Sequence, residues 1–277
     1  MAIEIVPITD LQGCTDLQAV HHVIWSNNDD EVIPTHVLIT WATSECVLLG
    51  AYDSSRREYH GMVGFALGWY GLTHHTPAQL KYCSHIVGVL PEYRGRDIGL
   101  QLKLAQRARL LAHGKTNLMT WTYDPLATVN GSFNVHRLGA VCTTYKRDVY
   151  GEMTDALNAG APSDRFQVDW WMDSERVADR VAQRYPVWQA DHIRYPVVVQ
   201  ANRPHIERIP DWNGAPVAVP LPEQLALLRT HDKQRLLEWR MMQRELFESA
   251  FAAGYQVVDC LAIEGRGWHY VMQPHAE

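Results

Sequence analysis

The sequence predicts an α/β (α+β) fold in which a mixed sheet is flanked by helices. Two observations predict it. Short apolar runs rich in β-forming residues occupy positions 46–52, 62–69, 80–90 and 118–123, and helical patterns precede or separate them. Such alternation is typical of layered α/β domains. A polar turn over residues 53–57 joins the first two runs and predicts a hairpin.

The remaining N-terminal elements are predicted from start and stop signals. Residues 4–8 are predicted to form a strand, and Thr9 or Asp10 to cap a helix that ends near residue 25. Pro34 is expected to begin a second helix.

The helix predicted over residues 100–113 has an apolar and a polar side. Its apolar side is predicted to hold Leu100, Leu104 and Leu111. Leu102 and Ala105 widen this side, whereas Lys103, Gln106, Arg107 and Arg109 fall mostly on the other side.

The chain is predicted to divide into a core, residues 1–152, and a C-terminal αβ extension, residues 153–277. The extension is expected to contain a strand over 166–171, a long helix around 236–250 and a final hairpin over 255–272.

Composition excludes several classes of protein. The chain has 277 residues, is 47% hydrophobic and carries a formal net charge of −6. This balance argues against general binding of nucleic acid or of anionic membranes, so any anion site must be local. The five cysteines are scattered and form no C-x-x-C pair, which predicts neither a disulfide framework nor a metal site. The sequence offers no signal peptide pattern and no apolar run near the ~20 residues that span a bilayer. A cytoplasmic location is therefore expected.

The most informative segment is residues 89–99, which read VLPEYRGRDIG. A predicted strand ends here, a short loop with two glycines and two arginines follows, and a helix begins. That order brings several main-chain N–H groups and a helix N-terminus to one place, which suits an anion such as a pyrophosphate. An ordinary strand–turn–helix is the alternative.

This segment resembles the signature loop of the GNAT-type N-acetyltransferase superfamily, and the resemblance extends over residues 1–152. It continues downstream at Asn130, Leu138, Gly139 and Ala140. The resemblance implies a mostly antiparallel central sheet and the transfer of an acyl group, from acetyl-CoA or another acyl-CoA, to the amine of a small metabolite such as an amino acid. The C-terminal extension is expected to complete the acceptor pocket. A homodimer is one possible oligomeric state.

The resemblance also implies cofactor contacts. Main-chain amides of the loop are expected to hold the pyrophosphate, and these belong to Arg94, Gly95, Arg96, Asp97, Ile98 and Gly99. The preceding strand edge is expected to bind pantetheine through Val87, Gly88 and Val89. Gly88 is predicted to form a β-bulge. Asn130 is expected to contact the pantetheine arm, with helix capping as the alternative.

Asp97 stands where the superfamily pattern has glycine. Asp is a good N-cap residue, but its carboxylate repels a diphosphate, by about 1 kcal/mol in water. Weaker cofactor binding is the expected result.

Catalytic roles are assigned to a histidine and a tyrosine. Strand alternation places Cys83, His85, Val87 and Val89 on one face, and a histidine there suits a general base. A packed structural histidine is the alternative. The superfamily's usual tyrosine acid is replaced by Val135.

Tyr145 is the first candidate to replace that acid, and Tyr123 is the second. A packing role is the alternative for both. Asn134 is predicted to point into the acceptor pocket. Arg165 is predicted to bind a substrate carboxylate. The alternative is a surface ion pair between Arg165 and Asp164 or Asp169.

Two other hypotheses remain beside the transferase. Asp97 and Val135 both favour a catalytically silent module that binds acyl-CoA. A structural α/β protein with a coincidental loop is the third.

Overall fold

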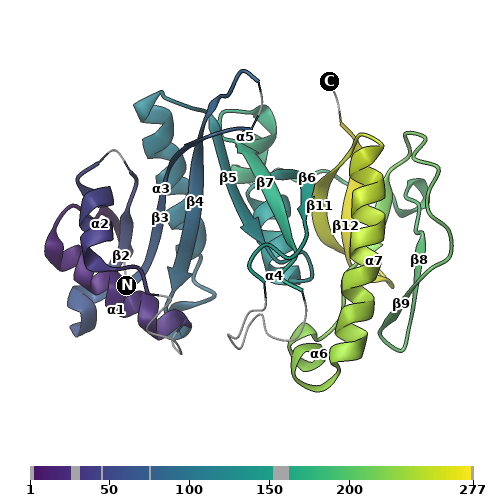
Figure 1. Ribbon diagram of the computed structural model, residues 1–277, viewed down its shortest axis with the longest axis horizontal. Helices are drawn as coiled ribbons and strands as arrows, with labels where there is room; N and C mark the ends of the chain where they lie inside the picture. Colours follow the sequence, from purple (N-terminus) through teal and green to yellow (C-terminus); the bar gives the residue numbers. More distant parts are fainter. Residues whose placement is uncertain (1–2, 26–31, 45, 75, 152–161, 276–277) are drawn as a thin grey trace. The chain divides into compact units, whose positions relative to one another are not determined.

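The computed structural model describes residues 3–25, 32–44, 46–74, 76–151 and 162–275 (Figure 1). Its internal contacts divide it into two compact units, Met1–Trp121 and Thr122–Glu277. The predicted core, residues 1–152, therefore includes all of the first unit and the beginning of the second. Its predicted end at residue 152 lies outside the described residues.

The first unit is a sheet with helices packed on it. The strands are β1 (Ile3–Pro7), β2 (Leu49–Asp53), β3 (Met62–Leu72), β4 (Leu80–Val89) and β5 (Leu118–Tyr123), whose last two residues fall in the second unit. The helices are α1 (Leu11–Trp25), α2 (Thr35–Ala42) and α3 (Ile98–His113), with short 3-10 turns over Glu58–Gly61 and Pro91–Tyr93. The strands lie in sequence order and pair antiparallel, except that β4 and β5 pair in parallel. The predicted β2–β3 hairpin is confirmed.

Local chemistry explains where these helices begin and end. The Asp10 carboxylate accepts a hydrogen bond from the Gly13 amide at 2.8 Å, so it caps α1. Pro34 is the N-cap of α2. Gly114 ends α3 in a left-handed conformation with φ of 64°, which glycine adopts without a steric penalty.

Helix α3 buries a different face from the one predicted. Leu102 and Leu110 are buried as expected of leucine, but Lys103 and Gln106 are buried with them. Leu104 is only partly buried. The prediction failed because two long polar side chains point at the sheet and find polar partners there.

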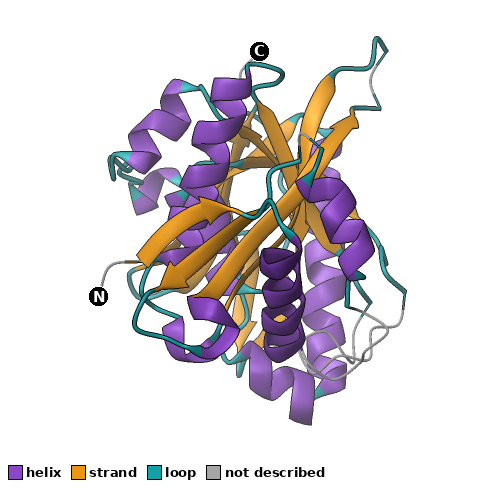
Figure 2. Ribbon diagram, turned by 90° about the vertical axis from the view of Figure 1, so that its left-hand side faces the viewer, coloured by secondary structure: helices purple, strands orange, loops and turns teal. Residues whose placement is uncertain are grey.

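The second unit has antiparallel strands with helices beside them, and Figure 2 colours the helices and strands of the chain by type. Its strands are β6 (Val141–Lys146), β7 (Arg165–Trp171), β8 (Val197–Gln200), β9 (Arg203–Ile206), β10 (Val217–Pro220), β11 (Tyr255–Ile263) and β12 (Gly267–Pro274). Its helices are α4 (Thr128–Gly131), a π-helical turn (Ser132–Arg137), α5 (Glu175–Val181), α6 (Leu225–His231) and α7 (Lys233–Ala252), with a 3-10 turn over Ala190–His192.

Sheet order in this unit is β7, β6, β11, β12, β10, while β8 and β9 form a separate hairpin. The predicted β11–β12 hairpin is confirmed. Aromatic rings from β7 and α7 fill the core, with Phe166 and Phe247 at 4.6 Å between centroids. The predicted fold class, a mixed and mostly antiparallel sheet flanked by helices, is confirmed.

Candidate functional site

Strands β4 and β5 separate after a short stretch of pairing. Their parallel register includes only Tyr82 opposite Met119 and Cys83 opposite Thr120. From Ser84 onward, the edge of β4 that faced β5 has left that pairing. The first unit therefore has a wedge between two neighbouring strands, which we call the β4–β5 wedge.

The main chain of β4 presents alternate residues to this wedge. The Leu90 amide donates to the Val63 carbonyl of the β3 side at 2.9 Å. Because polar groups alternate along a strand, Gly88 also faces β3, whereas Val87 and Val89 face the wedge. The Val89 carbonyl accepts a hydrogen bond from Arg94 Nε at 3.3 Å, in agreement with this phase. Val87 and Val89, but not Gly88, thus have main-chain groups placed for an added strand-like ligand.

The bulge in β4 lies at His85, not at Gly88. Leu67 pairs with Ile86, but the next β3 residue pairs with Ser84, so His85 is the extra residue. Gly88 pairs regularly with Phe65. The predicted bulge at Gly88 is wrong, because close packing requires glycine at this position. A Cβ atom there would lie 2.6 Å from Trp25 Cη2.

The bulge also changes which side chains share a face. His85 contacts Trp69, which stacks on Trp41 of α2, and Gly88 abuts Trp25 of α1. Residues three apart lie on opposite faces of a regular strand, so the extra residue has put both on the side of α1 and α2. The predicted common face for His85, Val87 and Val89 is therefore wrong.

His85 sits against a row of aromatic rings. Its ring centroid is 5.0 Å from that of Trp69, which is 5.0 Å from that of Trp41. The side chain is exposed, yet its neighbours displace enough water to lower its pKa. A neutral imidazole at physiological pH is able to accept a proton.

A second histidine lies close to His85. His21 of α1 is buried, and its Nδ1 has no hydrogen-bond partner. Burial lowers its pKa, and the charges of His85 and His22 lower it further. Both rings therefore favour the neutral form.

The loop from β4 to α3 uses some of its amides internally and leaves others. The Tyr93 amide donates to the Leu90 carbonyl at 2.9 Å, and the Arg94 amide to the Pro91 carbonyl at 3.2 Å. The expected use of the Arg94 amide for a ligand is therefore wrong. Within the described part of the chain, no hydrogen bond is found for the amides of Gly95, Arg96, Ile98 and Gly99.

Two residues of this loop have a left-handed backbone. Gly95 has φ of 78°, and a Cβ atom there would meet nothing within 4 Å, so the conformation itself explains the glycine. Asp97 has φ of 57° at the N-cap of α3 and makes no side-chain capping bond. The structure thus places Asp in a conformation that favours glycine.

Side chains tether the loop to the turn that follows β2. The Tyr93 hydroxyl donates to Asp53 at 2.9 Å, and Arg56 donates to Glu92 at 2.8 Å. The Arg96 guanidinium lies 4.7 Å from the centre of the Tyr93 ring. These contacts hold the loop without using its free amides.

The other predicted site residues belong to the second unit. Asn130 is exposed near the end of α4, whose N-cap is Ala127, so it is not a helix cap. Asn134 is buried in the π-helical turn, next to the fully buried Val135.

Tyr145 and Arg165 meet at Asp164 in this unit. The Tyr145 hydroxyl donates to the Asp164 carboxylate at 2.8 Å, and burial raises the pKa of Tyr145. Arg165 is buried and donates to the Asp164 carbonyl at 3.0 Å. The surface ion pair considered as an alternative for Arg165 is therefore wrong.

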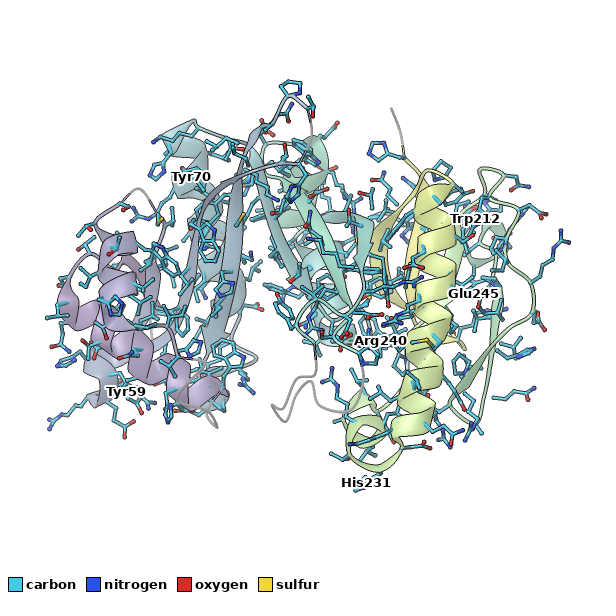
Figure 3. All side chains as sticks on the ribbon, in the orientation of Figure 1. Tyr59, Tyr70, Trp212, His231, Arg240 and Glu245 are labelled. Carbon is cyan, nitrogen blue, oxygen red and sulfur yellow. The ribbon has the colours of Figure 1, made fainter. Side chains whose placement is uncertain are left out.

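Sequence reasoning missed a buried ionic network. Asp124 accepts hydrogen bonds from Arg229 at 2.6 Å and Arg240 at 2.9 Å, and Arg240 extends from α7 toward its own unit's strands (Figure 3). Burial opposes ionisation of Asp124, but Arg240 and Arg229 outweigh it and lower its pKa. Isolated arginines and aspartates in a sequence give no sign of such pairing.

The described residues lack two other kinds of feature. They contain no cluster of three or more His, Cys, Asp or Glu side chains able to hold a metal ion. None of their helices has the length and hydropathy to cross a membrane.

No protein-family model matches the sequence, and no curated protein matches it. Among solved structures, the chain is similar in fold to GNAT-type acetyltransferases. Similar structures include NAA60 of Arabidopsis thaliana with a bisubstrate analogue (15% identity, 61% of this chain, 98% of that chain, TM-score 0.48). Another is the NatC complex bound to Gag peptide and CoA (14% identity, 61% of this chain, 98% of that chain, TM-score 0.47). A third is yncA of Salmonella typhimurium with acetyl-CoA (15% identity, 63% of this chain, 96% of that chain, TM-score 0.46). Similarity at this level decides nothing about activity.

Proposed function

We propose that this chain is an acyl-CoA-dependent N-acyltransferase that moves an acyl group, in the first instance acetyl, to the amine of a small metabolite. One observation carries the proposal. An open strand edge at Val87 and Val89 runs directly into a loop and helix start, where the amides of Gly95, Arg96, Ile98 and Gly99 have no hydrogen bond among the described residues. The pantetheine amides need the first feature and the diphosphate needs the second.

The residues present fit such a ligand. The amides of Gly95, Arg96, Ile98 and Gly99 would bind the diphosphate oxygens, aided by the positive end of α3. Val87 and Val89 would hydrogen-bond the pantetheine arm. Asn130 is proposed as a further contact to that arm.

His85 is proposed as the general base. Its neutral ring is able to take a proton from the attacking ammonium, directly or through water. The amine then attacks the thioester carbonyl, and the thiolate leaves readily because a thiol has a pKa of about 8.5. We propose that Asn134 and Arg165 contact the acceptor, whose pocket residues 153–277 would complete.

The general acid is the step at which the two candidate functions differ. For Tyr145 to protonate the thiolate, its hydrogen bond to Asp164 would have to break. Val135 offers no proton donor. These two observations favour the second candidate function, a silent module that binds acyl-CoA.

Two measurements on the full chain separate the candidates. Calorimetry measures coenzyme A binding, and thiol release from acetyl-CoA is followed with a panel of small amines. Binding together with amine-dependent release supports the transferase. Tight binding without any acceleration leaves the silent module, and lack of binding rejects both.

A further inference from the structure

A buried lysine lies at the closed end of the β4–β5 wedge. The last paired residues are Cys83 and Thr120, so Ser84 and Trp121 are the next along each strand. Lys103 Nζ donates to Ser84 Oγ at 2.8 Å and lies 3.5 Å from the centre of the Trp121 ring. The amine thus contacts the first residue of each strand beyond their mutual pairing.

The surroundings of this amine favour a nucleophile. A third contact, Met119 Sδ, lies 3.6 Å away. These contacts are a hydroxyl, a thioether and an indole. Only 2% of Lys103 is exposed, and this burial lowers its pKa well below the usual value. A lysine in such surroundings is readily neutral, and its neutral form carries the lone pair that attacks carbonyl groups.

A hydrogen-bond chain holds the amine in place. Ser84 Oγ donates to Gln106 Oε1 at 3.3 Å, so the serine oxygen is oriented to accept from Lys103. Ser84 also directly precedes the bulge residue His85. The amine is therefore fixed beside the part of β4 where the proposed function puts the reacting end of the pantetheine arm.

We propose that Lys103 is an internal acyl acceptor, which takes an acyl group from acyl-CoA bound in the β4–β5 wedge. This inference rests on the proposed function for the presence of acyl-CoA. The Lys103 nitrogen forms a bond to the thioester carbonyl carbon, and the carbon–sulfur bond breaks with its electron pair on sulfur. The proton lost from nitrogen ends on that sulfur. The products are an acylated lysine and free coenzyme A.

The test incubates the full chain with acetyl-CoA and without any amine. Intact mass measures the acetyl groups gained, and proteolytic mapping assigns them. Lys115 is an internal control, because it also lies near an aromatic ring, Tyr70 at 5.7 Å, but is exposed and outside the wedge. We expect acetyl at Lys103 to exceed that at Lys115 at least about tenfold, since a fixed amine reacts faster than a free one.

Matched variants sharpen the assignment. Lys103→Met keeps an unbranched, flexible side chain but removes the amine, so it should lose the label at position 103, whereas Lys115→Arg should keep that label. Since mapping in the unmodified chain identifies the site, the result does not depend on how well Lys103→Met folds. Denatured chain should label both lysines alike.

Failure of this inference differs from failure of the proposed function. If coenzyme A binds but Lys103 gains no more acetyl than Lys115, the internal acceptor is wrong and the proposed function is not affected. If coenzyme A does not bind, both are overturned.

Discussion

Two glycines at opposite ends of helix α3 allow a controlled test of the candidate site. Gly95 and Gly114 have φ of 78° and 64°, and a Cβ atom added at either would meet nothing within 4 Å. Gly95→Ala and Gly114→Ala therefore impose the same kind of backbone strain without a clash. Only Gly95 lies among the free amides of the loop.

The magnitudes follow from the backbone and the hydrogen bonds. A left-handed alanine costs about 1–2 kcal/mol, and the less flexible unfolded chain offsets about 0.4–1 kcal/mol of that. Both variants should lose roughly 1 kcal/mol of unfolding free energy. In Gly95→Ala we expect the backbone to move toward negative φ and to turn one amide from the diphosphate, so that a charge-assisted hydrogen bond worth about 1.5–3 kcal/mol is lost.

Calorimetry with coenzyme A and thermal unfolding are the two assays. A loss of about 1.5–3 kcal/mol means that Kd rises by about 10- to 150-fold for Gly95→Ala. Gly114→Ala should leave Kd unchanged while lowering the melting temperature similarly. If both variants bind coenzyme A with the same Kd, whether unchanged from wild type or raised equally, the diphosphate role of the loop is refuted.

Three further predictions address other residues. Asp97→Asn keeps a residue that tolerates left-handed backbone but removes its charge, so calorimetry at low salt should give coenzyme A binding a few-fold tighter than wild type, a gain that salt removes. His85→Asn should lower kcat by about 10²- to 10⁴-fold with little change in coenzyme A affinity. Because burial lowers the pKa of His85, the activity of the wild-type protein should persist below pH 6.5 and fall only as pH drops through that lowered pKa. Asp124 and Asp259 have lowered pKa values, so the stability they contribute is present above their unfolded pKa of about 3.9 and is lost as pH falls through the folded values. Acid titration followed by circular dichroism should therefore show less acid loss in Asp124→Asn, relative to its own neutral-pH stability, and an unchanged acid profile would contradict this.

Strong local patterns made much of the fold predictable. The polar turn after β2, the glycine that ends α3 and the final hairpin each have a short-range cause that a sequence displays. The strand, loop and helix of residues 89–99 also follow from neighbouring residues. The unused amides of that loop depend on bonds over only a few positions.

Features that depend on distant partners could not be predicted. Lys103 and Gln106 were predicted to lie on the polar side of their helix, but Ser84 of β4 supplies a buried partner for both. The bulge at His85 depends on how β3 and β4 pair, and a single strand contains no sign of it. Arg165 is buried, and its charge interacts with Asp124 and Arg240, which lie far from it in the sequence.

The bare α-carbon of Gly88 has a consequence for how this strand tolerates change. Even one methyl group there would meet Trp25 Cη2 at 2.6 Å and Ile24 Cδ1 at 2.9 Å. In a saturation library scored for folded protein, we expect position 88 to reject every substitution, alanine included, whereas its exposed neighbour at 85 accepts many. If the library is selected for catalysis instead, position 85 should also reject most substitutions, and position 88 should tolerate none in either selection.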